Sequence, residues 1–176
     1  MSTVPAFLIM DKPQPNLLGE WLHEVKSKED AFINGIPKVE LHIHIEGTMT
    51  PLLRWNLAQK YGLKVLNPVT GAEYKSMEEM KITLYPLLSK VSDYTGQPPF
   101  FKSYYDGCEV LQSEDDFYQL AMGYFRQAAE MNIRYCEVFF DPQAHTRRGV
   151  KLETLMNGLK RARDEAIKLK VWMAQF

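Results

Sequence analysis

The 176-residue sequence contains only two cysteines, Cys108 and Cys136. Two thiols cannot build a disulfide framework, and they also exclude the zinc sites that are made mainly of cysteine. We therefore expect both residues to be buried, reduced thiols, which is the usual state of free cysteine in a folded domain.

The sequence also lacks an excess of charge of either sign. Its 21 basic and 22 acidic residues leave a net charge of −1, and the basic residues do not cluster. Proteins that bind nucleic acids or membrane surfaces depend on such an excess, so we expect neither partner. The aromatic residues between Phe100 and Tyr105 have helical spacing and no basic groove beside them, and we expect them to pack in a core rather than to stack on bases.

Long hydrophobic runs are missing as well. No segment approaches the roughly 18 apolar residues that span a bilayer, and the first ten residues have neither the basic start nor the apolar length of a signal peptide. These absences predict a protein of the cytoplasm, with the nucleus left open as a second location.

Apolar periodicity predicts an alternation of strands and helices. Period-two and continuous apolar patterns predict strands at residues 39–45, 134–140 and 171–176, and helical spacing predicts helices at 17–33, 51–61, 113–131 and 151–170. Thr50 and Ser113 are expected N-caps. Ser76 with Glu79 is a further capping signal, and Pro86 should break or kink the helix that follows this signal. Strands that alternate with helices predict an α/β fold with a parallel sheet.

The first predicted strand carries the residues with the clearest chemistry, His42 and His44. Residues i and i+2 of a strand point to the same side, about 6 to 7 Å apart, so the two imidazoles can converge on one metal ion. Zinc accepts neutral histidine nitrogens, and a catalytic zinc keeps one position open for water. A half-exposed strand with no metal is the alternative. Either way, the expected polar face is Glu40, His42, His44 and Glu46, and the expected apolar face is Val39, Leu41, Ile43 and Ile45.

Two separated motifs resemble the adenosine/adenine deaminase family. The first is IPKVELHIHIEGT at residues 36–48, and the second is CEVFFDPQAHTRRGV at residues 136–150, which resembles the fungal and bacterial adenine deaminases in particular. The resemblance implies a (β/α)₈ TIM barrel, of which this chain would supply about three βα units and some extra helices. It also implies an N-terminal extension with one helix at residues 1–36 and a partial barrel domain at residues 37–176.

The resemblance further implies a zinc-dependent hydrolase of purine salvage that converts adenine to hypoxanthine and ammonia, with adenosine deaminase as the near alternative. His42 and His44 match the first two zinc ligands of the family. Adenosine deaminases carry Asp where this chain has Glu46, so Glu46 is a candidate substrate-binding residue whose longer carboxylate would take the space of the sugar. The alternative role for Glu46 is that of a carboxylate at the barrel mouth that supports its neighbours. His145 is expected to bond its local backbone, or else to face the site.

The remaining catalytic residues of the family are expected beyond Phe176. A third histidine ligand, a proton-transferring glutamate, another histidine and an aspartate ligand come from later strands, and no histidine follows His145. A complete barrel has eight strands and about 250 residues, and a catalytic zinc usually has three protein ligands. We therefore expect these residues alone to be a truncated, inactive form. A catalytically dead fragment that interacts through its open sheet edge is a further alternative.

Overall fold

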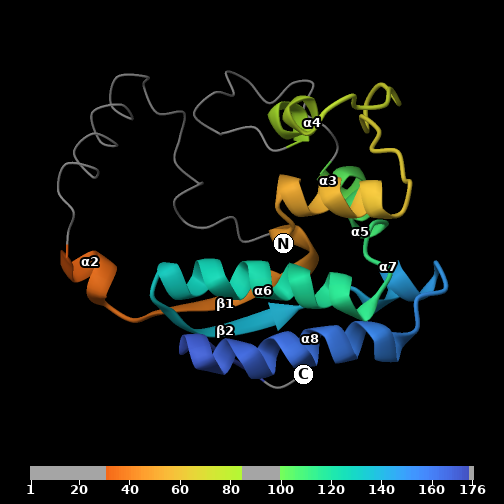
Figure 1. Ribbon diagram of the computed structural model, residues 1–176. Helices are drawn as coiled ribbons and strands as arrows, with labels where there is room; N and C mark the ends of the chain where they lie inside the picture. Colours follow the sequence, from red (N-terminus) through yellow and green to blue (C-terminus); the bar gives the residue numbers. More distant parts are fainter. Residues whose placement is uncertain (1–30, 85–99, 175–176) are drawn as a thin grey trace, which may run out of the picture.

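The structure is a computed structural model that describes residues 31–84 and 100–174. Its helices and strands follow one another as shown in Figure 1: α2 (Ala31–Gly35), β1 (Lys38–His44), η2 (Ile45–Thr48), α3 (Pro51–Lys60), α4 (Met77–Leu84), α5 (Phe100–Cys108), α6 (Glu114–Glu130), β2 (Ile133–Phe139), α7 (Pro142–Thr146), α8 (Leu152–Ala166), η4 (Ile167–Leu169) and β3 (Trp172–Met173). Most of the helix predicted at residues 17–33, and the break predicted at Pro86, lie outside the described residues.

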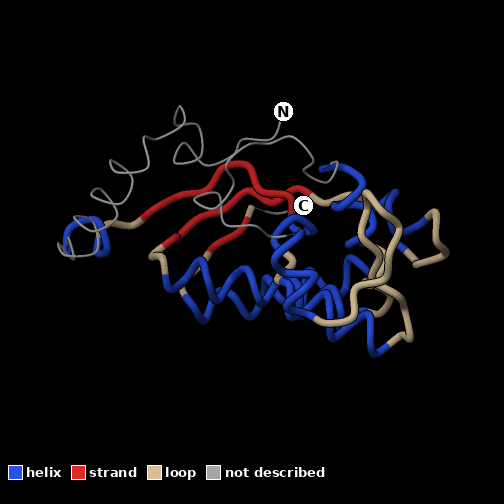
Figure 2. The backbone as a smooth tube through the Cα atoms, turned by 90° about the horizontal axis from the view of Figure 1, so that it is seen from above, coloured by secondary structure: helices blue, strands red, loops and turns tan. Residues whose placement is uncertain are grey.

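The three strands form one parallel sheet in the order β1-β2-β3. The chain returns from β1 to β2 through α3 to α6, and from β2 to β3 through α7 and α8. Figure 2 shows the helices, in blue, on one side of the red strands. The α/β class and the parallel sheet predicted from the sequence are therefore confirmed. No helix in the described ranges is long and apolar enough to cross a membrane.

The side-chain alternation predicted for β1 breaks near Leu41. The register with β2 shifts between Glu40 and Ile43, as at a β-bulge. Glu40 consequently turns toward α6, where the Tyr124 hydroxyl donates a hydrogen bond of 2.8 Å to its carboxylate. The prediction that Glu40 shares a face with the two histidines was wrong, because a one-residue shift exchanges the faces of a strand. The exposed residues on β1 are Val39, Leu41, His42 and His44.

Helix α6 supplies the centre of the core, as its sequence predicts. Ser113 is the N-cap: its hydroxyl accepts a hydrogen bond from the Asp116 amide, and the Asp116 carboxylate accepts one from the Ser113 amide, which completes a capping box. Helix α8 packs along α6 and presents Leu155, Leu159, Ala162 and Ala166 to the core. The buried stripe of α6 is the predicted one: Phe117, Leu120, Ala121, Tyr124, Phe125 and Ala128.

Two expectations about burial were wrong. The aromatic stretch is helical, as α5, but Phe100, Phe101 and Tyr105 are 62%, 69% and 48% exposed. The nearly continuous apolar sequence of β2 is typical of a strand covered on both faces, yet Phe139 at its end is 47% exposed. In the described part of the chain, helices cover only one side of the sheet (Figure 2), which accounts for Phe139. In both cases periodicity does not tell which apolar residues have a partner.

Asp116 joins the end of α3 to the start of α6. Its buried carboxylate accepts hydrogen bonds from Lys60 Nζ at 2.7 Å and from the Tyr61 hydroxyl at 2.6 Å. The backbone amides of Gln112 and Ser113 donate to it at 3.0 and 2.7 Å. Burial raises the pKa of Asp116, but these hydrogen bonds outweigh burial and hold the pKa below its usual range.

We expect Asp116→Ala to lower the free energy of unfolding by about 3 kcal/mol at pH 7, because it removes one half of the capping box and the buried acceptor that four donors share. The folded-state pKa lies below the unfolded value of about 3.9, so the stabilisation is fully present above pH 4. It is lost as the pH falls through the folded-state pKa. Urea denaturation of both proteins at pH 7 and at pH 3 should therefore show the difference shrinking in acid.

Asp115→Ala is the matched control, because Asp115 lies beside Asp116 in the same helical turn but is exposed and pairs with Arg161. We expect a loss of less than about 1 kcal/mol. Equal losses from the two alanine variants at pH 7 would contradict the role assigned to Asp116.

Candidate metal and substrate site

Strand β1 ends in two histidines whose rings converge. The Nε2 atoms of His42 and His44 are 3.3 Å apart, and the ring centroids are 5.3 Å apart. Two nitrogens bound to one tetrahedral zinc at about 2.0 to 2.1 Å stand roughly 3.3 to 3.4 Å from each other. The two residues therefore fit a single zinc ion in spacing as well as in chemistry.

Phe139 supports both imidazoles from the neighbouring strand. It is the last residue of β2 and pairs with His44 across the ladder. Its ring stacks on His42 with a centroid distance of 4.4 Å and on His44 with 5.6 Å, at interplanar angles of 25° and 22°. The exposed aromatic side chain thus limits the orientations that the two rings can adopt.

The described residues offer two metal ligands and no more. Within residues 31–84 and 100–174 there is no group of three or more histidine, cysteine, aspartate or glutamate side chains that could hold a metal ion. A catalytic zinc usually has three protein ligands and a water. The two histidines of the described residues are therefore fewer ligands than a catalytic zinc usually has.

Glu46 lies two residues beyond His44, in η2, and its side chain is only 1% exposed. Oε1 of its carboxylate accepts a hydrogen bond of 2.9 Å from the Asp141 amide and lies 3.1 Å from His145 Nε2. Oε2 accepts a hydrogen bond of 3.2 Å from the Tyr104 hydroxyl. Burial, together with the charges of Glu46 and Asp141, raises the pKa of Tyr104 well above its ordinary value, so the phenol stays a donor. The carboxylate is thus held from α5, from α7 and from the end of β2.

His145 is completely buried in α7, with its ring edge-on to Phe117. Besides Glu46 it contacts Arg148, whose Nη2 lies 3.0 Å from Nδ1. The expectation that its ring bonds the local backbone was wrong, because both nitrogens contact side chains. Sequence analysis also missed Tyr104 as a partner of Glu46. No local signal marks these pairs, since the partners are 99 and 58 residues apart in the chain.

The two cysteines are inert in this fold, as expected. Cys108 and Cys136 are free and buried, and burial raises the pKa of the first thiol to about 12 and that of the second to about 11. Because the thiolate is the form that attacks and that binds metals, neither residue is a nucleophile or a ligand.

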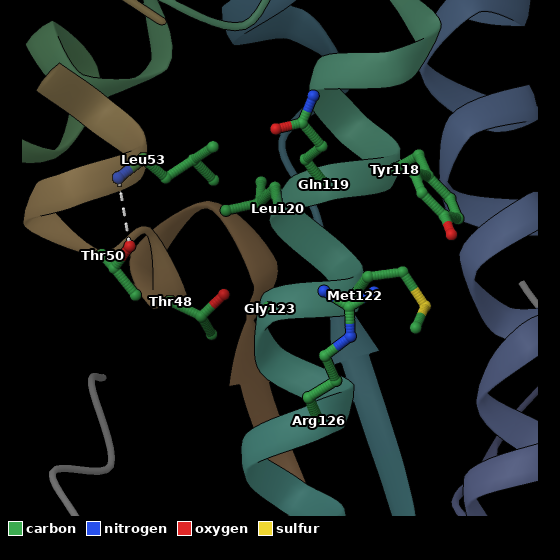
Figure 3. Close-up of a pocket in the computed structure, with 9 residues that line it drawn as sticks. All are labelled: Thr48, Thr50, Leu53, Tyr118, Gln119, Leu120, Met122, Gly123 and Arg126. Carbon is green, nitrogen blue, oxygen red and sulfur yellow. Dashed lines mark hydrogen bonds between the residues drawn. The ribbon is translucent and has the colours of Figure 1, made fainter. Parts of the chain in front are cut away.

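A pocket of about 200 Å³ lies close to the end of β1 but does not contain the histidines. Figure 3 shows that it opens between η2, the first turn of α3 and α6. At the edge of the pocket, the Thr50 hydroxyl caps α3 by accepting a hydrogen bond from the Leu53 amide. The pocket is lined by Thr48, Thr50, Leu53, Tyr118, Gln119, Leu120, Met122, Gly123 and Arg126. Because α6 forms one wall, the pocket is on the helix side of the sheet, whereas the imidazoles are exposed next to Phe139, away from the helices.

The model of the family described as adenosine deaminase matches residues 37–171. The chain belongs to this family. It is 41% identical to an adenine deaminase of Acinetobacter baylyi over 138 residues, which are 78% of this chain and 37% of that protein. It is also 41% identical to an adenine deaminase of the fungus Gibberella zeae over 144 residues, 81% of this chain and 38% of that protein.

The crystal structure of an adenine deaminase from Arthrobacter aurescens has the same fold, with a TM-score of 0.62 and 36% identity, over 78% of this chain and 38% of that one. The predicted resemblance to bacterial and fungal adenine deaminases is therefore confirmed. So is the fold class: this chain has the fold of the N-terminal part of a (β/α)₈ barrel. It spans less than two fifths of the length of these relatives. The division into an extension at residues 1–36 and a barrel domain at 37–176 stays a prediction.

Proposed function

We propose that this chain forms the N-terminal part of the barrel of a zinc-dependent adenine deaminase, with His42 and His44 as the first two zinc ligands. The observation that carries the proposal is the 3.3 Å separation of their Nε2 atoms, which matches one tetrahedral ion. The position of the pair supports it as well, because catalytic groups of β/α barrels lie at the carboxyl ends of the strands.

The residues of this chain have separable roles in the proposed reaction, the hydrolysis of adenine to hypoxanthine and ammonia. Zinc held at this place would supply a hydroxide nucleophile at neutral pH, by lowering the pKa of its bound water. His42 and His44 offer Nε2 lone pairs, and Phe139 stacks against both rings and so limits their rotation. Glu46 places a buried, hydrogen-bonded carboxylate two residues beyond the second ligand.

The test compares zinc content and adenine turnover in this chain and in a form extended by the remaining barrel strands. We expect one zinc per chain and adenine turnover in the extended form, and neither in the present 176 residues. Zinc with deamination of adenosine alone would favour the adenosine deaminase alternative. Robust turnover by the present residues would refute the ligand set.

Glu46 is proposed to favour free adenine by occupying the space that a ribose would need. In the extended form, Glu46→Asp should lower the ratio of kcat/KM for adenine to that for adenosine by about tenfold or more, because one methylene in a fitted pocket has an effect of that size. Steady-state kinetics with both substrates measures the ratio.

Glu40→Asp is the matched control, since Glu40 lies six residues earlier, in β1, and faces Tyr124 of α6. We expect it to leave the ratio unchanged. A Glu46→Asp enzyme with the unaltered preference would exclude the selectivity role and leave Glu46 as a carboxylate that supports the barrel mouth. The predicted location, cytoplasmic or nuclear, and the predicted lack of nucleic-acid and membrane partners stay predictions.

A further inference from the structure

Glu46, His145 and Arg148 form a hydrogen-bonded chain from the end of β1 to the loop that follows α7. Glu46 Oε1 lies 3.1 Å from His145 Nε2, and Arg148 Nη2 lies 3.0 Å from His145 Nδ1. The side chains of His145 and Glu46 are 0% and 1% exposed. The contact between these two side chains is therefore shielded from water.

The contact with Arg148 fixes the tautomer of His145. A guanidinium group has only donors, so Nδ1 accepts the hydrogen bond and carries no proton. The imidazole proton is consequently on Nε2, from which it is donated to Glu46. Arg148 is itself anchored to the backbone, because its Nη2 also donates to the carbonyl oxygen of Cys108 at 2.9 Å and its Nη1 to that of Glu109 at 3.1 Å.

The donors around Glu46 define one orientation of its carboxylate. His145 and the Asp141 amide both donate to Oε1, and Tyr104 donates to Oε2. A buried carboxylate depends on such charge-assisted hydrogen bonds. Of the three donors, only His145 is itself oriented by a guanidinium group, that of Arg148.

We propose that His145 is a positioning residue of this deaminase: it fixes the Glu46 carboxylate at the end of β1 and thereby sets the preference for a free purine base over its nucleoside. The inference rests on the proposed function, in which Glu46 takes the space of the sugar. Without the N–H of His145, Oε1 keeps only the Asp141 amide and Oε2 only the Tyr104 hydroxyl, so the carboxylate is held less firmly at the place where it excludes a ribose.

Two substitutions in the extended form separate this role from a merely structural one. In His145→Gln the side-chain amide keeps an N–H donor at the level of Nε2, within reach of Glu46. In His145→Asn the side-chain oxygen keeps an acceptor for Arg148 at the level of Nδ1, but the shorter residue cannot reach Glu46. Both variants are polar, and each keeps one of the two contacts. A residue that only anchored Arg148 would not be rescued by glutamine in preference to asparagine.

We expect His145→Gln to keep the adenine-to-adenosine ratio of kcat/KM within about threefold of the wild type, and His145→Asn to lower it by about tenfold or more. Both variants should retain one zinc per chain. Equal ratios in the two variants, with the wild type active on adenine, would overturn this inference and leave the proposed function intact. A wild-type extended form that does not deaminate adenine would overturn the proposed function itself, and the inference with it.

A second measurement examines the wild-type protein directly. Nitrogen-15 NMR of the wild-type extended form, with the His145→Gln spectrum for assignment, reports which ring nitrogen carries the proton. The expected signature is a neutral ring protonated on Nε2. A ring protonated on Nδ1, alone or together with Nε2, would overturn the hydrogen-bonded chain from which the inference starts.

Discussion

We expect alanine in place of His42 or His44 to abolish zinc binding in the extended form of this chain and to lower adenine turnover by a factor on the order of 10³ or more. Each substitution removes one of two imidazoles whose Nε2 atoms lie 3.3 Å apart. It thereby takes away one of the three protein ligands that a catalytic zinc usually has. Because the nucleophile depends on the ion, kcat should fall with the zinc content. Metal analysis and steady-state kinetics on the same preparations give both quantities.

His23→Ala is the control for this pair. The sequence has four histidines, and His23 is the one that belongs neither to the metal pair nor to the Glu46 cluster; it lies outside the described residues. We expect full zinc content and full turnover. If His42→Ala and His44→Ala keep one zinc per chain, the metal is bound elsewhere and the proposed ligands are wrong.

Gly158→Ala should destabilise the fold by about 3 kcal/mol, because it places a methyl group where α8 meets α6. A Cβ at this position would overlap the carbonyl oxygen of Glu114 and lie 2.8 Å from the Phe117 Cβ and 3.1 Å from the Tyr118 amide nitrogen. Two of these neighbours are backbone atoms of α6, so the helices must separate to make room. Urea denaturation followed by circular dichroism measures the loss.

Gly123→Ala makes the same chemical change in the middle of α6 and should have the opposite effect. Nothing lies within 4 Å of a Cβ built at Gly123, so the substitution adds only helix propensity, which is worth about 0.5 to 1 kcal/mol of stabilisation. A pair of opposite signs would show that close helix packing, and not the loss of glycine as such, accounts for the cost at Gly158. Stabilisation by both variants would contradict the packing of α8 on α6.

What could be predicted from the sequence is what depends on residues close together in the chain. Helix α6 has a capping box at Ser113 and Asp116 and an apolar stripe with a period of 3.6 residues, and both signals fall within a single element. The convergence of His42 and His44 follows from the period of two in a strand. Thr50 with Pro51 gives the start of α3 for the same local reason.

What could not be predicted depends on partners far away in the chain. The orientation of Glu40 is reversed by the register with β2, which a single strand pattern does not contain. Glu46 and His145 are 99 residues apart, and no local pattern in the sequence indicates that their side chains contact each other. The amphipathic pattern of α5 predicted a helix, but it did not predict that Phe100 and Phe101 would stay exposed. In each case the missing information is which surface covers which residue.

The bulge in β1 has a consequence for how this strand tolerates changes of length. Below the register shift the strand is fastened to α6 through Glu40, and above it His42 and His44 point the other way. Deleting Leu41 would remove the extra residue and leave anchor and ligands on opposite faces, whereas a regular pleat that kept every residue of β1 would place them on one side. In such a pleat, either Glu40 would leave Tyr124, or the imidazoles would turn into the apolar layer beneath α6. One residue of β1 that has no counterpart on β2 therefore separates the part of the strand that is fastened to α6 from the part that carries the two histidines.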